Sequence, residues 1–222
     1  DNLVKARQKY WQVLPLGPTS FGDSPYASFS AFAGNPYFID LDMLIEEGLL
    51  TKEFVDSKRW NIEDQYVDYG LGYNSRFEVL RVAYENSNHK ELDEYKEFFT
   101  ENEFWLEDYS LYRACKDKYE GRPWSEWDKK IKFREGETVG AFKEELKDDM
   151  DFYKFIQFKF NEQWCKLKEY ANENGILIIG DIPIYVAMDS ADVWQNTGMF
   201  QLDEELNPKK VAGVPPDAFS DL

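Results

Sequence analysis

The chain has 222 residues, of which 43% are hydrophobic and 31% are charged, as in an ordinary globular protein and unlike a disordered or fibrous one. Lys and Arg number 26 against 43 Asp and Glu, which gives a formal net charge of -17. Such a surface repels phosphate backbones and anionic lipids, so nucleic acid is not expected as a partner. No apolar window approaches the roughly 20 residues of a membrane span, so we expect no membrane crossing.

Few residues offer histidine or thiol chemistry. Cys115 and Cys165 show neither a CxxC pattern nor a His-rich neighbourhood, so we expect no disulfide, no metal site and a cytoplasmic location. The single histidine, His89, sits in a polar run and is expected in a solvated loop, which excludes a histidine-based triad within this chain. The chain opens at Asp1 without a basic and apolar leader, so we expect no secretory signal and a start inside a longer protein.

Two apolar runs, residues 10–16 and 176–179, predict buried strands, and the second, which does not alternate with polar residues, fits a strand covered on both faces of a parallel sheet. About 130 residues separate them, far more than a simple crossover needs, so the connection must hold an inserted helical subdomain. The sequence therefore predicts an α/β fold. Helical spacing of apolar residues predicts helices over the following ranges: 40–50, ending at Gly48; 76–85; 91–119, broken by 120–124; and 138–151 with 152–172, as one or two helices, the latter range with Phe155, Phe158, Trp164 and Leu167 on its apolar side.

Functional groups in parallel sheets gather at the carboxyl ends of the strands, and both strands are followed by candidate residues. After the first come Asp23, Ser24 and Tyr26, which could hydrogen-bond sugar hydroxyls and stack on a sugar face; the alternative is a plain turn. After the second comes Asp181, whose burial without a role would be costly. The alternative is that Asp181 caps the backbone at Pro183 or Ile184.

Each of two further features allows two interpretations. The Pro-rich stretch 211–220 could be a flap over a cleft or an exposed linker. Aromatic residues make up 17% of the chain, so some could form stacking surfaces, although most could equally be core. The 43 acidic residues allow too many pairings for spacing alone to identify a catalytic pair.

Long motifs at both ends resemble one family, the 4-alpha-glucanotransferases called amylomaltases or disproportionating enzymes. The similarity runs in the same order along nearly the whole chain. The matching segments are 11–19, 22–26, 28–37 and 39–41 near the start, 105–109 and 123–124 in the middle, and 180–187, 191–194 and 211–217 near the end.

The resemblance implies a (β/α)8 barrel of the α-amylase clan, of which this chain would hold strands 2 and 3. Residues 1–40 would form barrel strand 2 and a substrate loop, 41–172 the helical insertion and a barrel helix, and 173–222 barrel strand 3 and the flap. Family members cleave an α-1,4-glucan, hold part of it as a covalent glycosyl-enzyme, and pass it with retention to a new 4-hydroxyl. Malto-oligosaccharides would be the partners, no cofactor is implied, and the oligomeric state is not predicted.

The resemblance also implies roles for individual residues. Tyr26 would stack on the sugar at the cleavage point, Asp181 would hydrogen-bond a sugar, and Asp23 and Ser24 would hold neighbouring glucose units. The remaining implied positions are the flap residues Gly213, Pro215, Asp217 and Phe219, and a second glucan site at Phe21 and Tyr73. Phe21 and Ala218 replace tyrosines that are common in the family.

The family's catalytic carboxylate motifs are absent from these 222 residues. The resemblance therefore places the nucleophile and the acid/base outside this chain, which we expect to be inactive alone. Two alternatives remain open: a non-catalytic glucan-binding module that uses Tyr26, Trp194 and the flap for stacking, and an α-amylase-like hydrolase with water as acceptor.

Overall fold

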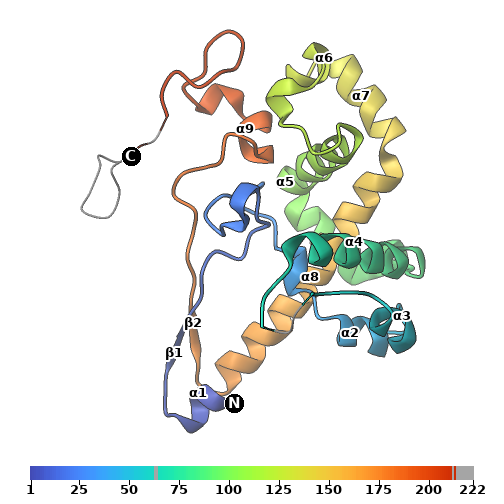
Figure 1. The fold of residues 1–222 in the computed structure, drawn as a ribbon, viewed down its shortest axis with the longest axis vertical. Coiled ribbons are helices and arrows are strands. Elements are labelled where there is room, and N and C mark those ends of the chain that lie inside the picture. The colour runs from blue at the N-terminus through green and yellow to red at the C-terminus, as the bar shows by residue number, and fades with distance from the viewer. Residues whose placement is uncertain (63–64, 212, 214–222) are drawn as a thin grey trace.

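Two short strands from distant parts of the sequence pair in parallel at one side of the molecule. A computed structural model describes residues 1–62, 65–211 and 213. Strand β1 (Tyr10–Gln12) lies beside β2 (Leu177–Ile179), with Trp11 opposite Ile178 (Figure 1). The predicted parallel pair and its mostly helical connection are confirmed, although each strand is only three residues long.

Helices form most of the rest of the described chain, and they gather on one side of the strand pair (Figure 1). The α-helices are α1 (Asn2–Lys5), α2 (Leu41–Glu46), α3 (Lys52–Asp56), α4 (Tyr69–Glu85), α5 (Asp93–Lys118), α6 (Lys129–Lys132), α7 (Gly136–Glu145), α8 (Lys147–Glu173) and α9 (Ala191–Gln195). Short 3-10 turns are η1 (Phe21–Asp23), η2 (Pro36–Phe38), η3 (His89–Glu91), η4 (Trp124–Glu126) and η5 (Thr197–Met199).

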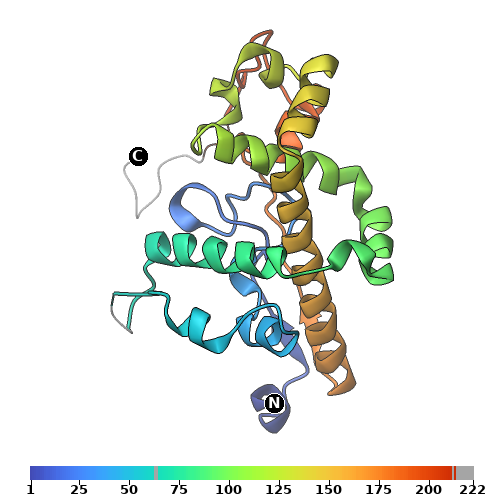
Figure 2. The same ribbon diagram turned by 90° about the vertical axis from the view of Figure 1, so that its right-hand side faces the viewer.

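Helix α8 is the structural axis, and it runs along most of the molecule's length (Figure 2). One apolar cluster joins α8 to α2, α3 and α4 and includes the fully buried Leu44, Leu80 and Phe155. A second cluster joins it to α5, α6, α7 and α9. Because α8 contributes to both clusters, it fixes the two halves of the helical region relative to each other.

Local signals explain several helix ends. The Asp40 carboxylate accepts a hydrogen bond of 2.8 Å from the Asp42 amide at the start of α2, and Gly48 follows this helix with a φ of 76°. Thr51 and Asp68 cap α3 and α4 in the same way. The predicted break after α5 is also confirmed, with Gly121 at a φ of 79°.

Two helix boundaries differ from the sequence prediction. Helix α4 begins at Tyr69, seven residues before the predicted start, because the Asp68 side chain caps it there. Residues 138–151 and 152–172, expected to form one or two helices, form two, and the break falls earlier than residue 151: α7 ends at Glu145 and α8 begins at Lys147. Periodicity does not locate this boundary, because charged residues occupy both sides of it.

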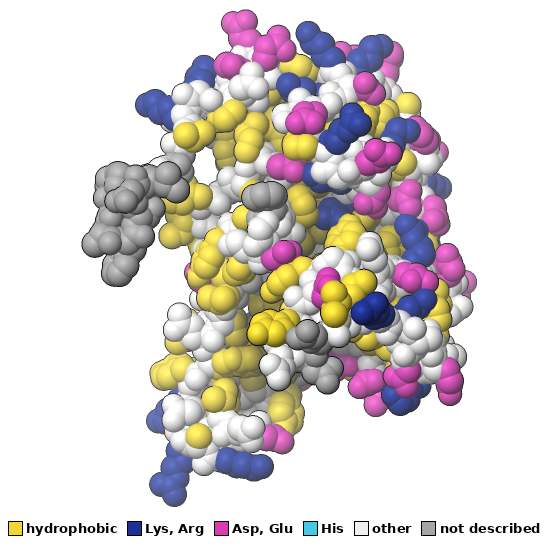
Figure 3. Space-filling model, viewed as in Figure 1, with side chains coloured by type: hydrophobic (Ala, Val, Ile, Leu, Met, Phe, Trp, Pro, Cys, Tyr) yellow, Lys and Arg dark blue, Asp and Glu magenta, His cyan; other side chains and the backbone are white. Residues whose placement is uncertain are grey.

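The prediction of strands buried on both faces is wrong for the described chain. Tyr10 is 59% exposed and Leu177 54%, while Trp11 and Ile178 are partly buried. Side chains alternate across a strand, and both strands follow this pattern, with the central residue partly buried and its neighbours exposed; α8 packs against β2. Hydrophobic side chains consequently lie on the surface of the strand-bearing side (Figure 3).

Two glutamines of α8 hold the segment that follows β1 through its main chain. Gln157 accepts a hydrogen bond from the Gly34 amide at 2.7 Å and donates one to the Gly34 carbonyl at 3.0 Å. Gln163 makes the same pair with Asp40, at 2.7 and 3.1 Å. A Cβ on Gly34 would come within 2.0 Å of the Phe160 ring, so glycine allows this close approach to α8.

Among the described residues, no helix combines the length and the hydropathy that crossing a membrane requires.

Candidate functional site

The loops that follow the two strands meet through a contact between Tyr26 and Asp181. The Tyr26 hydroxyl donates a hydrogen bond of 2.6 Å to Asp181 Oδ2, across 155 positions of sequence. This hydrogen bond raises the pKa of Tyr26, with smaller contributions from burial and from the carboxylate charge. The Tyr26 side chain remains 47% exposed, so its ring is accessible to a ligand.

Asp181 also caps the loop that it begins. Its Oδ1 accepts a hydrogen bond of 2.8 Å from the Ile182 amide. The predicted capping at Pro183 or Ile184 is therefore wrong in position, since proline has no N–H and the amide that is bound is that of Ile182; the carboxylate combines this contact with the tyrosine contact. A carboxylate has about four acceptor positions, so Asp181 can accept further hydrogen bonds from a ligand.

Asp23 and Ser24 lie in a tight turn that presents Tyr26. Gly22 and Asp23 have φ values of 78° and 53°, and the Ser20 amide donates to the Ala27 carbonyl across the turn. The Ser24 hydroxyl accepts a hydrogen bond from the Tyr26 amide at 3.3 Å. The turn interpretation is thus confirmed, and Asp23 remains exposed and accessible to a ligand.

The loop after β2 is anchored to the helical region by an acid that sequence reasoning missed. Asp189 accepts hydrogen bonds from Tyr112 Oη at 2.8 Å and from the Trp124 amide at 3.2 Å, and its Oδ2 lies 2.7 Å from Lys116 Nζ. Its position just before Ser190, which caps α9, was the one available signal. These contacts hold the segment that carries Asp181 against α5.

A second link joins the two loops directly. Asp192 accepts a hydrogen bond of 2.9 Å from the Ala31 amide, which belongs to the segment after β1. Burial raises the pKa of Asp192, and this backbone hydrogen bond partly offsets the increase. Asp192 therefore has a structural role in fixing one loop against the other.

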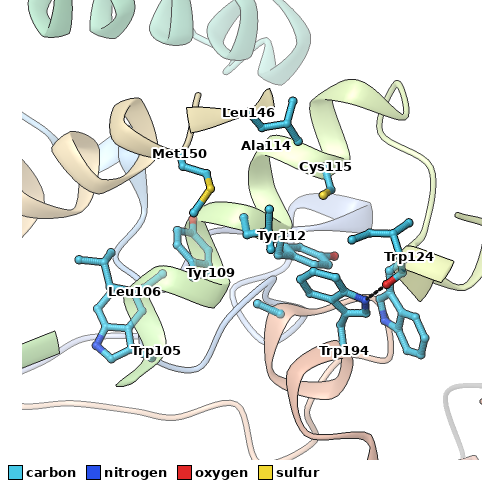
Figure 4. Packing of buried hydrophobic residues seen from close by; sticks show 14 of the residues in the cluster. Trp105, Leu106, Tyr109, Tyr112, Ala114, Cys115, Trp124, Leu146, Met150 and Trp194 are labelled. Carbon is cyan, nitrogen blue, oxygen red and sulfur yellow. Dashed lines mark hydrogen bonds between the residues drawn. The ribbon is translucent and has the colours of Figure 1, made fainter. Parts of the chain in front are cut away.

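Most large aromatic side chains are core, and Trp194 is one of them. The alternative that used Trp194 as a stacking surface is wrong, because this side chain is fully buried. It lies beside Tyr112, with ring centroids 6.1 Å apart, and donates from Nε1 to the Ile131 carbonyl (Figure 4). Trp124, which belongs to the same apolar cluster, is also fully buried.

The solvated position predicted for His89 is also wrong. The side chain is only 3% exposed and lies against the rings of Tyr84, Tyr95 and Phe155. Burial lowers the pKa of His89 to about 4, and the Lys90 charge adds to this effect. The polar run around it misled the prediction, because the tertiary packing of α4, α5 and α8 covers a residue that is locally polar.

Of the two residues predicted for a second glucan site, Phe21 and Tyr73, only Tyr73 has a described side chain. It is 41% exposed on α4, and its ring centroid lies 4.6 Å from that of Phe77. The side chain of Phe21 lies outside the described residues. Of the flap, Gly213 is described and exposed. Pro215, Asp217, Ala218 and Phe219 lie outside the described residues.

Two cavities lie near the loop after β1, and Asp23 lines both. The larger one, of about 1060 Å³, lies between β1, α4 and α8 and has mainly apolar walls that include Trp11 and Trp164. Tyr26 and Asp181 do not line it, so it is separate from the contact between the loops. The smaller one, of about 270 Å³, lies between this loop, α4 and α5.

Metal coordination has no support in the described parts of the chain, where no three His, Cys, Asp or Glu side chains come together. The fold and the site define an α/β protein whose accessible acidic and aromatic side chains meet at the carboxyl ends of two parallel strands. This combination of carboxylates and an exposed ring is suited to ligands with hydroxyl groups and a flat apolar face.

Comparison with known proteins identifies the family. Residues 1–222 match the family described as 4-alpha-glucanotransferase, and the chain belongs to it. A 4-alpha-glucanotransferase of Clostridium butyricum is 52% identical over 222 residues, which cover 100% of this chain and 46% of that protein. One of Thermus thermophilus is 46% identical over 223 residues, covering 99% of this chain and 44% of that protein.

A solved structure supports the same assignment. The amylomaltase of Streptococcus agalactiae in complex with acarbose superposes with a TM-score of 0.93 at 41% identity, over 99% of this chain and 45% of that one. The chain thus spans a little under half the length of the relatives that it matches. The resemblance stated from the sequence motifs is confirmed.

Proposed function

We propose that this chain supplies substrate-binding loops to a 4-alpha-glucanotransferase, which passes a segment of an α-1,4-glucan to a new 4-hydroxyl with retention. In this proposal β1 and β2 are barrel strands 2 and 3, and residues 1–40, 41–172 and 173–222 are the barrel, insertion and barrel-plus-flap parts. Membership of the family supports the proposal, and so does the acarbose complex of the Streptococcus agalactiae amylomaltase. A cytoplasmic location remains a prediction from the cysteine pattern.

The observation that carries the proposal is the 2.6 Å contact between Tyr26 and Asp181. It brings an exposed ring and a carboxylate from different loops to one place, as recognition of a sugar requires. The ring would stack on a glucose face, and the carboxylate would accept hydrogen bonds from its hydroxyls. Asp23 and Ser24, on the same turn as Tyr26, would hold adjacent glucose units.

Other parts of the proposal rest on the resemblance. The flap would comprise Gly213, Pro215, Asp217 and Phe219, and the second glucan site Phe21 and Tyr73. The nucleophile and the acid/base are expected outside these 222 residues. Neither alternative is favoured, because the relatives are named transferases and Trp194 is unavailable for stacking.

The test is disproportionation of maltotriose by the natural full-length protein and its Asp181→Asn variant. Loss of the charge weakens hydrogen bonds to sugar hydroxyls, so we expect kcat/KM to fall by at least about ten-fold. Glu101→Gln, which removes an exposed acid on α5, is the matched control and should retain activity within about two-fold. Equal activity of Asp181→Asn and the wild type would refute the assigned role.

A further inference from the structure

The smaller cavity contains a buried cation that the proposed function does not use. This cavity of about 270 Å³ lies between the loop after β1, helix α4 and helix α5. The side chains that matter for its chemistry are Tyr37, Tyr73, Phe77, Tyr109, Arg113 and Asp117.

Arg113 is the cation, and its charge is not neutralised by direct contact. The residue is 5% exposed, and no described carboxylate oxygen lies within 4.0 Å of its guanidinium nitrogens. Its hydrogen bonds within the described chain are two long ones from Nη2, to the hydroxyls of Tyr73 at 3.5 Å and Tyr153 at 3.4 Å. Among the same residues, Nε has no partner.

The neighbouring charged groups are already engaged. Asp117 accepts a hydrogen bond of 2.5 Å from the Tyr153 hydroxyl, and burial raises the pKa of this carboxyl. Lys116, the other cation of the cavity wall, pairs with Asp189 at 2.7 Å. Asp23 is exposed, so water and salt screen its charge. Arg113 is therefore the charged group of the cavity that has no described carboxylate in direct contact: its guanidinium lies 5.0 Å from the ring centroids of Phe29 and Tyr153, and the Tyr153 hydroxyl bridges it to Asp117.

Three tyrosine hydroxyls in the cavity wall add hydrogen-bond donors. The hydroxyls of Tyr37, Tyr73 and Tyr109 donate to no acceptor within the described parts of the chain. Burial raises the pKa of Tyr37 and of Tyr109 to about 12, so both remain protonated and can donate near neutral pH. A guanidinium with several O–H donors is the donor set that an oxyanion requires.

We propose that this cavity binds a small oxyanion, free or carried on a hexose, through Arg113 and the hydroxyls of Tyr73 and Tyr109. A guanidinium binds carboxylate and phosphate oxygens better than the tyrosine hydroxyls and aromatic faces that surround Arg113, and its Nε has no partner within the described chain. The cavity is larger than a phosphate group needs, and the ring of Phe77 in its wall could contact the face of an attached sugar.

Isothermal titration calorimetry on the natural full-length protein tests the proposal, with inorganic phosphate and glucose 6-phosphate as separate probes at constant ionic strength. We expect one saturable site per chain. Arg113→Met should lower the affinity by at least about ten-fold, because it removes a charge-assisted contact. Lys168→Gln, which removes an exposed cation on α8, should leave it within about two-fold. Tighter binding of glucose 6-phosphate would identify the hexose-borne anion, and equal binding the free ion.

A second measurement needs no variant of Arg113. In the wild-type protein with fluorinated tyrosines, phosphate should shift the 19F resonances of Tyr73 and Tyr109 and leave that of Tyr10, on the exposed face of β1, unchanged. Chloride at matched ionic strength should shift none of them. The proposal is overturned if neither probe gives saturable binding, if Arg113→Met binds as tightly as the wild type, or if the two tyrosines do not respond. Because these readouts measure binding alone, they are independent of transferase activity.

Discussion

Tyr26 carries two separable groups where the loops meet, a ring that is 47% exposed and a hydroxyl bonded to Asp181. Tyr26→Phe keeps the ring and removes a hydrogen bond, so we expect kcat/KM for maltotriose to fall by about five- to ten-fold. Tyr26→Ala removes the stacking surface as well and should lower it by about a further ten-fold. Steady-state kinetics of both variants would check this order, and equal losses would show that the ring contributes nothing.

His89 makes the stability of the protein depend on pH in a defined window. Its pKa is about 4 in the folded chain against 6.5 ordinarily, so between these values the unfolded chain binds more protons. Stability therefore falls as the pH is lowered through this window, by up to about 3 kcal/mol for this group.

The variant His89→Phe tests this effect, because His89 is the sole histidine of the chain. Urea unfolding at pH 7 and pH 4.5 should show a smaller loss of stability in the variant, by about 2 kcal/mol. The carboxylates titrate in both proteins, so their contribution cancels in the comparison. An identical loss in both proteins would contradict the depressed pKa.

At the scale of elements, the partly buried pair of Lys116 and Asp189 joins α5 to the segment before α9. Lys116→Met leaves the Asp189 carboxylate without its cation, so we expect a loss of about 2–3 kcal/mol in the free energy of unfolding. A double-mutant cycle with Asp189→Asn should give a double variant less damaged than the sum of the single ones. Additive losses would mean that the pair contributes no coupling.

Two glutamines of α8 position the segment after β1 through paired hydrogen bonds to its main chain. Gln157→Leu deprives the buried amide and carbonyl of Gly34 of their partners and should cost about 2–4 kcal/mol. Gln163→Leu should cost less, because Asp40 is exposed and water can replace the lost bonds. Chemical denaturation of both variants, with Lys168→Leu as the control for a leucine on α8, measures this order. A greater loss for Gln163→Leu would contradict it.

At the scale of the whole molecule, the sequence predicted the arrangement of strands and helices better than the burial of individual side chains. Two short apolar runs predicted both strands and their parallel pairing, and the length between them predicted the helical insertion. The burial of the strands was wrong, since coverage of the outer face at Tyr10 and Leu177 depends on neighbours and not on local pattern. The predicted exposure of His89 and Trp194 was wrong for the same reason, because tertiary packing decides which side chains are covered.

In the candidate site, too, some residues could be predicted from the sequence and others could not. Position after a strand was enough to select Tyr26 and Asp181, because parallel strands bring their following loops to one edge. The anchoring role of Asp189 and the cavity at Arg113 were not predictable, since both depend on contacts between helices far apart in sequence. The roles of Asp23, Ser24, Tyr73 and the flap in binding glucan stay predictions.

The central claim is that these loops serve glucan transfer, and the products formed from maltotriose test it most directly. The natural full-length protein should convert maltotriose into glucose together with longer malto-oligosaccharides, because the cleaved segment passes to another sugar. Chromatography of the products over time would show both series rising together. Glucose and maltose without any longer product would identify water as the acceptor and contradict the claim.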